Sequence, residues 1–338
     1  RVVLSMVPLV GLGTARLDGA EVKAAVLAAI EAGYRHIDCA KVYGNEEFVG
    51  DALAEAFERG MVAREAMCIT SKLWNDDHRP EHVEAACRGS LERLGLEYLD
   101  VYLVHWPAPW KKGTVLCPDP GVTTMDTWRA MEDLVRKGLV KEIGLSNFGR
   151  RRIQIILDQG TIRPTVNQIE IHPACQQPEL VEFCKARDIL VTAWSPLSKG
   201  RVSAASVAHH HTEVLASIAS AHSLSLTQTV LLWHKQRGVA AIPRSKNPDH
   251  IRDNFLMLST DECLTDAEMK RIAELDKGER LTSDWVGVFE ETAWPWPWVG
   301  TCLGWVSQLI WFLIPFRVDL KMPASGPPAS RRRVRGAR

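Results

Sequence analysis

The sequence lacks an excess of charge of either sign, because 41 Lys and Arg residues balance 41 Asp and Glu residues. A protein that attracts nucleic acid or an anionic membrane through its overall field carries a basic excess. We therefore expect no nucleic-acid partner, and a small neutral molecule is the better candidate for a binding partner.

Paired cysteines are also absent. The eight cysteines are scattered and form no Cys-x-x-Cys pair, which argues against a zinc site or a disulfide framework and for a reducing compartment. Residues 1–8 are too short and too soon interrupted by Pro8 for a secretory signal. Both observations predict a cytoplasmic protein.

His209, His210 and His211 invite a metal-site interpretation. Consecutive residues of a regular element cannot all converge on one ion, and no carboxylate cluster accompanies them. We expect a loop at these histidines and no metal.

Short apolar runs alternate with amphipathic stretches up to about residue 275. The runs predict a first strand at Leu9-Val10 and others that end near Ile37, Thr70, Val104, Leu145, Ile169, Ala193 and Ile242. Helices are predicted over 20–32, 46–59, 80–94, 125–137, 150–159, 178–186 and 228–237. Eight strand-then-helix units predict an α/β fold, and eight is the number that closes a (β/α)8 TIM barrel of about 250 residues.

An open, doubly wound sheet would give the same alternation. However, Gly11-Leu12-Gly13 lacks the third glycine of a dinucleotide-binding fingerprint, and the first long helix is predicted only near Ala20. A Rossmann fold therefore loses its main support.

Four polar residues stand near the ends of three successive predicted strands: Asp38 and Tyr43 after the second, Lys72 after the third and His105 after the fourth. In a barrel these strand ends face one rim, so the four side chains would converge on one pocket. Singly, each has an ordinary interpretation, such as a helix cap for Asp38, a solvated charge for Lys72 and a packing residue for His105.

Together, the four residues suit carbonyl reduction. Hydride delivery builds negative charge on the carbonyl oxygen, which needs a proton from an acid within hydrogen-bond reach. A phenol with an ordinary pKa of about 10 is too weak an acid unless a cation favours its ionised form, and Lys72 can supply that cation to Tyr43. Asp38 would hold Lys72, and His105 would donate to the substrate oxygen.

Three segments carry a specific resemblance: Asp38-Cys39-Ala40-Lys41-Val42-Tyr43-Gly44-Asn45-Glu46, Thr70-Ser71-Lys72-Leu73-Trp74 and Leu103-Val104-His105-Trp106-Pro107. They resemble the signatures of the aldo-keto reductase family, and the resemblance extends from about Gly11 to Asp276 in the same order and with similar spacing. It implies a (β/α)8 barrel, reduction of an aldehyde or ketone to the alcohol with NADPH, and a catalytic tetrad of Asp38, Tyr43, Lys72 and His105.

The same resemblance implies the contacts of the nicotinamide. Ser146, Asn147 and Gln168 would hold its amide, and Trp194 would stack on its ring. Trp194 stands where the family usually has Tyr, which keeps the stacking surface and removes a hydroxyl. The alternatives are a helix cap for Ser146-Asn147 and an ordinary strand end for Gln168. Further cofactor contacts are expected from Gly13, Thr14, Ser195 and Leu197.

The segment 242–254 resembles the loop that binds the adenosine 2'-phosphate, although a basic run can also be a solvated face. Its donors lie beside a predicted helix N-terminus and favour NADPH; they are Arg244, Ser245, Lys246 and Asn247. The family usually has Arg at His250, which is mostly neutral at pH 7, and Glu at Asp253, beside Asn254. Some tolerance of NADH is therefore expected.

An apolar wall is expected around the polar centre, as in most small-molecule sites. Trp74, Trp106 and Trp110 would form it, unless each is ordinary core packing. Ala15 stands where many relatives have Trp, which should enlarge the substrate pocket.

The C-terminal part lacks charge over a long stretch. No charged residue occurs from Ala293 to Phe316, where five of the 12 tryptophans fall. We divide the chain into a barrel at 1–284, an atypical Trp-rich apolar extension at 285–321 and a disordered basic tail at 322–338. A lid over the substrate or a disordered extension is favoured for the apolar extension. The alternative is a membrane tail over 293–316, which would hold the protein on the cytosolic face of a membrane. Prolines within this stretch weaken that interpretation.

A non-enzymatic role is the second hypothesis, because the same fold resembles NADP-binding regulatory or structural subunits. The complete tetrad favours the enzyme, and we expect a monomer.

Overall fold

The computed structural model describes residues 6–198, 209–259 and 261–281. All of them belong to one compact unit, Arg1–Trp298. The predicted segments 285–321 and 322–338, with the proposed lid or membrane tail, lie outside the described residues, so those boundaries stay predictions.

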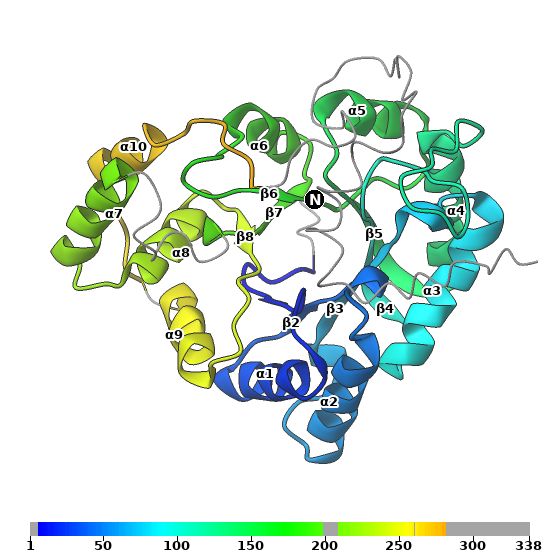
Figure 1. Cartoon of the computed structure of the whole chain (residues 1–338), viewed down its shortest axis with the longest axis horizontal. Coiled ribbons are helices and arrows are strands. Elements are labelled where there is room, and N and C mark those ends of the chain that lie inside the picture. The colour runs from blue at the N-terminus through cyan, green and yellow to red at the C-terminus, as the bar shows by residue number, and fades with distance from the viewer. Residues whose placement is uncertain (1–5, 199–208, 260, 282–338) are drawn as a thin grey trace, which may run out of the picture. The chain divides into compact units, whose positions relative to one another are not determined.

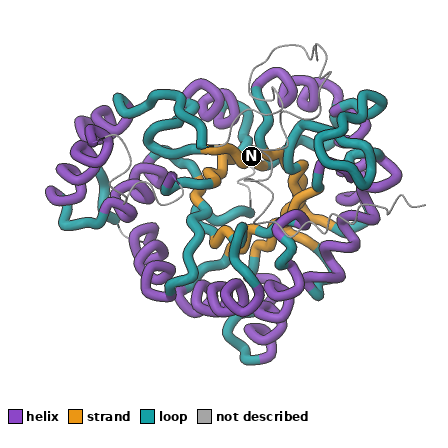
Figure 2. The backbone as a smooth tube through the Cα atoms, in the orientation of Figure 1, coloured by secondary structure: helices purple, strands orange, loops and turns teal. Residues whose placement is uncertain are grey.

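Eight parallel strands form one sheet in which each strand pairs with the next along the chain. They are β1 (Leu12–Gly13), β2 (His36–Asp38), β3 (Cys68–Leu73), β4 (Leu99–Val104), β5 (Val140–Ser146), β6 (Val166–Glu170), β7 (Leu190–Trp194) and β8 (Ala240–Ala241). Figure 2 shows the strands as a ring surrounded by helices. The arrangement agrees with the predicted α/β barrel.

The ring closes between its first and last strands. Val10 forms a parallel bridge with Ala241, the Gly11 amide donates to the Ala241 carbonyl at 3.0 Å, and the Ala241 amide donates to the Leu9 carbonyl at 2.8 Å. A Cβ at Gly11 would lie 2.4 Å from His36 Nδ1, so only glycine fits at this point of the closure.

Helices cover the outside of the ring (Figure 1). They are α1 (Gly19–Ala32), α2 (Glu46–Glu58), α3 (Pro80–Leu94), α4 (Thr124–Arg136), α5 (Arg150–Gln159), α6 (Pro178–Lys185), α7 (His209–Ala221), α8 (Leu226–Gln236), α9 (Pro248–Ser259) and α10 (Asp266–Ala273). Short 3-10 turns are η1 (Lys41–Tyr43), η2 (Arg64–Ala66) and η3 (Asn75–Asp77). Val22, Val26 and Ile30 of α1 repeat every four residues and are buried, which places one apolar stripe of the helix on the sheet.

Several predicted boundaries were wrong. The first strand lies at Leu12–Gly13, and Leu9-Val10 only bridges β8. β3 continues to Leu73, so Lys72 lies within the strand and not after it. Polar side chains are tolerated there because partners in the interior satisfy them, as the 2.6 Å hydrogen bond from Ser71 to Glu46 shows.

The expected loop at the three histidines was also wrong, because they begin α7. Tertiary packing supports this helix despite its polar start, since Leu215 and Ile218 are buried. Helices α7 and α10 were not predicted, whereas the helix N-terminus expected after Asn247 is that of α9.

Within the described ranges, none of the helices is individually long and apolar enough to cross a membrane. The bent pair Thr212–Ala221 and Leu226–Gln236, with 86° between its two parts, meets the length and composition test only together. The predicted tail at 293–316 lies outside these ranges.

Candidate active site

The four predicted tetrad residues come from neighbouring strand ends. Asp38 is the last residue of β2, Lys72 lies near the end of β3, His105 follows β4, and Tyr43 ends η1. Because the strands are parallel and adjacent, these four positions lie at the same end of the barrel.

The ammonium group of Lys72 connects the acid and the tyrosine. Lys72 Nζ donates to Asp38 Oδ1 at 2.6 Å, to the Cys39 carbonyl at 2.8 Å and to Tyr43 Oη at 3.3 Å. The Lys72 side chain has no exposed surface. Burial alone lowers the pKa of Lys72, but Asp38 and Tyr43 outweigh it and raise the pKa above its ordinary value, so the group stays an ammonium.

Asp38 is held from two more directions. Gln168 Nε2 donates to Asp38 Oδ2 at 2.7 Å, so both carboxylate oxygens have partners. The backbone carbonyl of Asp38 accepts a hydrogen bond from the Thr14 hydroxyl at 2.9 Å. Asn45 Nδ2 in turn donates to the Thr14 carbonyl at 2.8 Å. The carboxylate that orients Lys72 is therefore itself held in place.

The pKa of Tyr43 depends on burial more than on its neighbour Lys72. Burial raises the pKa of Tyr43 to about 12, and the neighbouring Lys72 lowers it only in part. Lys72 does favour the ionised form of the phenol, as the sequence predicts, but desolvation is the larger effect and the net shift of the pKa is upward. The phenol is protonated at neutral pH.

His105 completes the group as a neutral imidazole. Burial holds the pKa of His105 well below its ordinary value, with Lys72 and His78 acting in the same direction. Its ring lies edge-on to Tyr43, with centroids 5.9 Å apart, and edge-on to Trp74 at 5.1 Å. Its Nδ1 atom is buried and has no hydrogen-bond partner in the described part of the chain.

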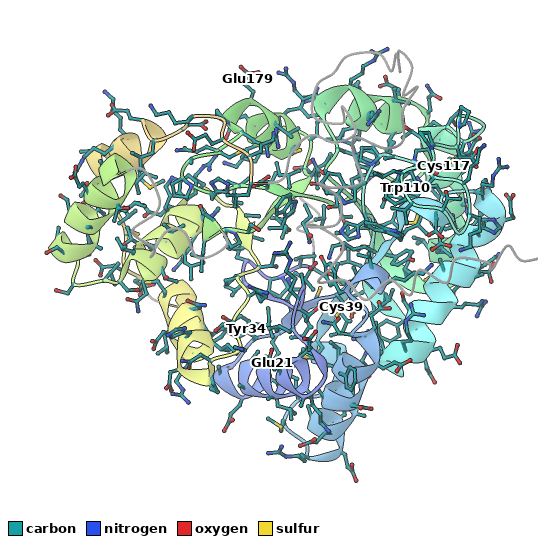
Figure 3. All side chains as sticks on the ribbon, viewed as in Figure 1. Glu21, Tyr34, Cys39, Trp110, Cys117 and Glu179 are labelled. Atoms are coloured by element: carbon teal, nitrogen blue, oxygen red, sulfur yellow. The ribbon has the colours of Figure 1, made fainter. Side chains whose placement is uncertain are left out.

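Aromatic residues continue from His105 into the following loop. Trp74 is partly buried and packs edge-to-face on Trp110 at 5.6 Å, while Trp106 and Trp110 are only 5% and 4% exposed. The Trp110 amide donates to the Asn75 carbonyl at 2.8 Å, and Figure 3 shows Trp110 near Cys117, in agreement with the bridge between Trp110 and Pro118. Trp74 and Trp110 thus form a cluster next to His105, and Trp106 directly follows His105 in the chain. Ala15 is partly buried and lies two residues after the end of β1.

The predicted nicotinamide residues form a connected network. The Ser146 hydroxyl donates to the Gln168 carbonyl at 3.0 Å, and Asn147 Nδ2 donates to the His105 carbonyl at 3.0 Å. Trp194 Nε1 donates to Asn147 Oδ1 at 2.9 Å. Asn147 has a φ of 63°, in the left-handed region that Asn tolerates better than most residues. Neither Ser146 nor Asn147 caps α5, whose N-cap is Gly149.

The predicted phosphate residues lie on the surface at the N-terminus of α9. Arg244, Lys246, Asn247 and His250 are exposed. Arg244 donates to the carbonyls of Ala15 and Arg16 at 3.3 Å, and Lys246 pairs with Glu21 at 2.8 Å. Ser245 is partly buried, Asp253 is exposed and Asn254 is buried.

The three remaining predicted cofactor residues lie near β1 and β7. A Cβ at Gly13 would lie 2.9 Å from the Ile242 carbonyl, so this glycine allows β1 to approach the segment after β8. Ser195 has a φ of 50° directly after β7, and Leu197 packs against the main hydrophobic core.

The donor chemistry of these residues fits a pyridine dinucleotide phosphate. Exposed cationic and amide groups at a helix N-terminus suit a phosphate dianion, and the network around Asn147 offers amide groups beside the partly buried indole of Trp194. Among the described residues, no group of three or more His, Cys, Asp or Glu could hold a metal ion.

Sequence reasoning missed Asp77, whose carboxylate joins three segments around the site. It is 1% exposed and pairs with Lys41 of η1 and with Lys112 of the loop after β4. Both partners are two residues from a predicted site residue, Tyr43 and Trp110. Asp77 stands in the polar run Asn75-Asp76-Asp77-His78-Arg79, which is typical of an exposed loop, so only the fold shows that Asp77 is buried between the two lysines.

Comparison with known proteins agrees with this geometry. A family model described as the aldo/keto reductase family matches residues 9–277. The chain belongs to this family. It is therefore an oxidoreductase of the aldo-keto reductase type, and the resemblance seen in the sequence is confirmed.

Three aldo-keto reductases illustrate how close the relatives are. Aldo-keto reductase family 1 member A1 from Bos taurus is 44% identical over 287 residues, which cover 81% of this chain and 87% of the relative. The aldose reductase of Schistosoma japonicum superposes with a TM-score of 0.77 at 39% identity, covering 86% and 95% of the two chains. The aldo-keto reductase of Bombyx mori, solved in complex with NADP, has a TM-score of 0.77 at 37% identity, covering 84% and 94%.

Proposed function

We propose that this aldo-keto reductase reduces a small aldehyde or ketone to the corresponding alcohol with NADPH. The hydrogen-bonded chain from Asp38 through Lys72 to Tyr43 carries the proposal, because it fixes a protonated phenol beside a neutral imidazole. The NADP complex of the Bombyx mori relative supports the choice of cofactor.

When bound, NADPH supplies the hydride. Tyr43 donates its Oη proton to the carbonyl oxygen as negative charge develops there. Lys72, 3.3 Å away, stabilises the phenolate that the transfer leaves behind, and Asp38 keeps Lys72 charged and oriented. The neutral imidazole of His105 donates to the carbonyl oxygen and orients it, while the tryptophan cluster excludes water.

Two groups of residues are proposed to bind the cofactor. Ser146, Asn147, Gln168 and Trp194 would hold the nicotinamide, and the 244–254 segment would hold the 2'-phosphate. The exposed cations at the start of α9 favour the phosphorylated cofactor. His250 contributes less than an Arg would, so we expect NADH to be used with lower affinity.

Isotope transfer tests the proposed reaction. Reduction of an aldehyde with NADPH deuterated at the transferred position of the nicotinamide should place deuterium on the carbonyl carbon, with the hydroxyl proton from solvent. Mass spectrometry of the alcohol measures this. Tight NADPH binding without turnover across aldehydes, ketones, sugars and steroids would contradict the proposal and favour the non-enzymatic subunit.

A further inference from the structure

A cavity of about 280 Å³ lies between α4, α5 and the loop that joins β4 to α4. We call it the α4–α5 cavity. None of its lining residues belongs to the tetrad or to the proposed cofactor and substrate contacts. Its walls are mostly apolar, with Trp128, Leu145 and Phe148 among them. The volume suits a molecule of roughly ten non-hydrogen atoms, at the small end of ligand pockets.

His78 brings a buried polar atom without a hydrogen-bond partner to this lining. His78 is 3% exposed, and its Nε2 atom makes no hydrogen bond within the described residues. The His78 carbonyl accepts from the Thr127 hydroxyl at 2.9 Å, which fixes the residue against α4. Burial lowers the pKa of His78 to about 4, so the ring is neutral. A buried polar atom without a partner is unfavourable, and a ligand that pairs with it gains affinity.

The cavity also touches the back of the active-site wall. Val104, which lines it, directly precedes His105, and Pro107 and Pro109 of the lining lie between Trp106 and Trp110 in the chain. A molecule in the cavity would therefore contact the segment that positions the imidazole and the tryptophans. Packed segments transmit such contacts because they cannot deform freely.

We propose that the α4–α5 cavity is a regulatory site for a small uncharged aromatic alcohol, whose hydroxyl pairs with His78 Nε2 and whose ring packs on Trp128 and Phe148. A hydroxyl both donates and accepts, so it satisfies either tautomer of a neutral imidazole. Arg152 and Asp119 also line the cavity, but both already have partners within the protein, so a charged ligand would be desolvated against mostly apolar walls, which disfavours it. The kinetic part of this inference rests on the proposed reductase function, and the binding part does not.

Calorimetric titration of the full chain, saturated with NADPH, tests binding with 4-methylphenol and with p-xylene, which has the same shape without the hydroxyl. His78→Phe keeps an aromatic ring and removes the nitrogen. It should lower the ratio of 4-methylphenol to p-xylene affinity by about fivefold. Val122→Trp, which fills the cavity from the loop side, should abolish binding of both molecules. Circular dichroism checks that each variant is folded.

An unchanged affinity ratio in His78→Phe, undiminished binding in Val122→Trp, or no binding to the unaltered chain would each overturn the site. In turnover assays, 4-methylphenol should lower kcat without competing with the aldehyde, and Val122→Trp should remove this effect. Purely competitive inhibition would overturn the regulatory role. A chain that binds 4-methylphenol but reduces no carbonyl would refute the proposed function and leave the site standing.

Discussion

The indole N–H of Trp194 donates to Asn147 Oδ1 at 2.9 Å. The hydrogen bond connects the end of β7 to the residue after β5, and Asn147 in turn donates to the carbonyl of His105. Tryptophan at position 194 therefore does more than offer a flat surface. Its nitrogen anchors an amide that we propose to contact the nicotinamide.

Trp194→Phe should weaken NADPH binding by about fivefold, the loss expected for one hydrogen bond. The aromatic surface is largely kept, so the effect reports the anchoring of Asn147. Quenching of protein fluorescence gives the dissociation constant. Trp74→Phe is the matched control, because Trp74 packs on His105 and Trp110; it should change the KM for the aldehyde and not the NADPH affinity. Equal NADPH affinities in Trp194→Phe and the unaltered chain would contradict this role.

Lys72→Met should lower the free energy of unfolding by about 3–5 kcal/mol, because it leaves the Asp38 carboxylate buried without its cation. Asp38→Asn should be similarly costly. In the double variant neither charge is left unpaired. Its loss of unfolding free energy should therefore be clearly smaller than the sum of the two single losses. Urea unfolding of all four proteins measures the coupling. Strictly additive losses would show that the pair is not coupled.

The pKa shifts predict a flat pH profile for kcat. Burial raises the pKa of Tyr43 to about 12, so the acid form persists through neutral and moderately alkaline pH. The lowered pKa of His105 keeps its imidazole neutral well below pH 6.5. Turnover at saturating substrate should therefore stay constant between about pH 6 and 9. A fall in kcat within that interval, assigned to a step before product release, would argue against Tyr43 as the acid.

His250→Arg should tighten NADPH binding about threefold at low salt, because an exposed guanidinium gains only modestly from a phosphate. His250 is exposed in the first turns of α9. NADH, which lacks the 2'-phosphate, serves as the internal control and should bind equally well to both proteins. The gain should shrink at high ionic strength. An equal gain for NADH would place His250 away from the 2'-phosphate.

Much of this site could be read from the sequence because barrel topology carries strand ends to one rim. Asp38, Tyr43, Lys72 and His105 lie on three segments of the chain, and the parallel order of β2, β3 and β4 brings them together. The apolar runs also predicted seven of the eight strands near their observed positions, whereas the first strand was misplaced. β3 extends further than its polar sequence Thr70-Ser71-Lys72 suggests.

Other features depend on tertiary contacts that no local pattern encodes. The hydrogen bond from Gln168 to Asp38 joins residues 130 positions apart. The raised pKa of Tyr43 comes from burial, whose extent a sequence does not state. Asp77 looks like a surface charge until the fold places it between Lys41 and Lys112.

Replacement of Tyr43 by Phe is the most direct test of the account. It removes one hydroxyl and should reduce kcat for aldehyde reduction by about 10³-fold, while the NADPH dissociation constant stays within about twofold, since Tyr43 is not proposed to bind the cofactor. Tyr102→Phe is the matched control, because Tyr102 is buried in β4 and its hydroxyl has no partner among the described residues; its turnover should match that of the unaltered chain. Turnover preserved in Tyr43→Phe would contradict the claim that this phenol protonates the substrate.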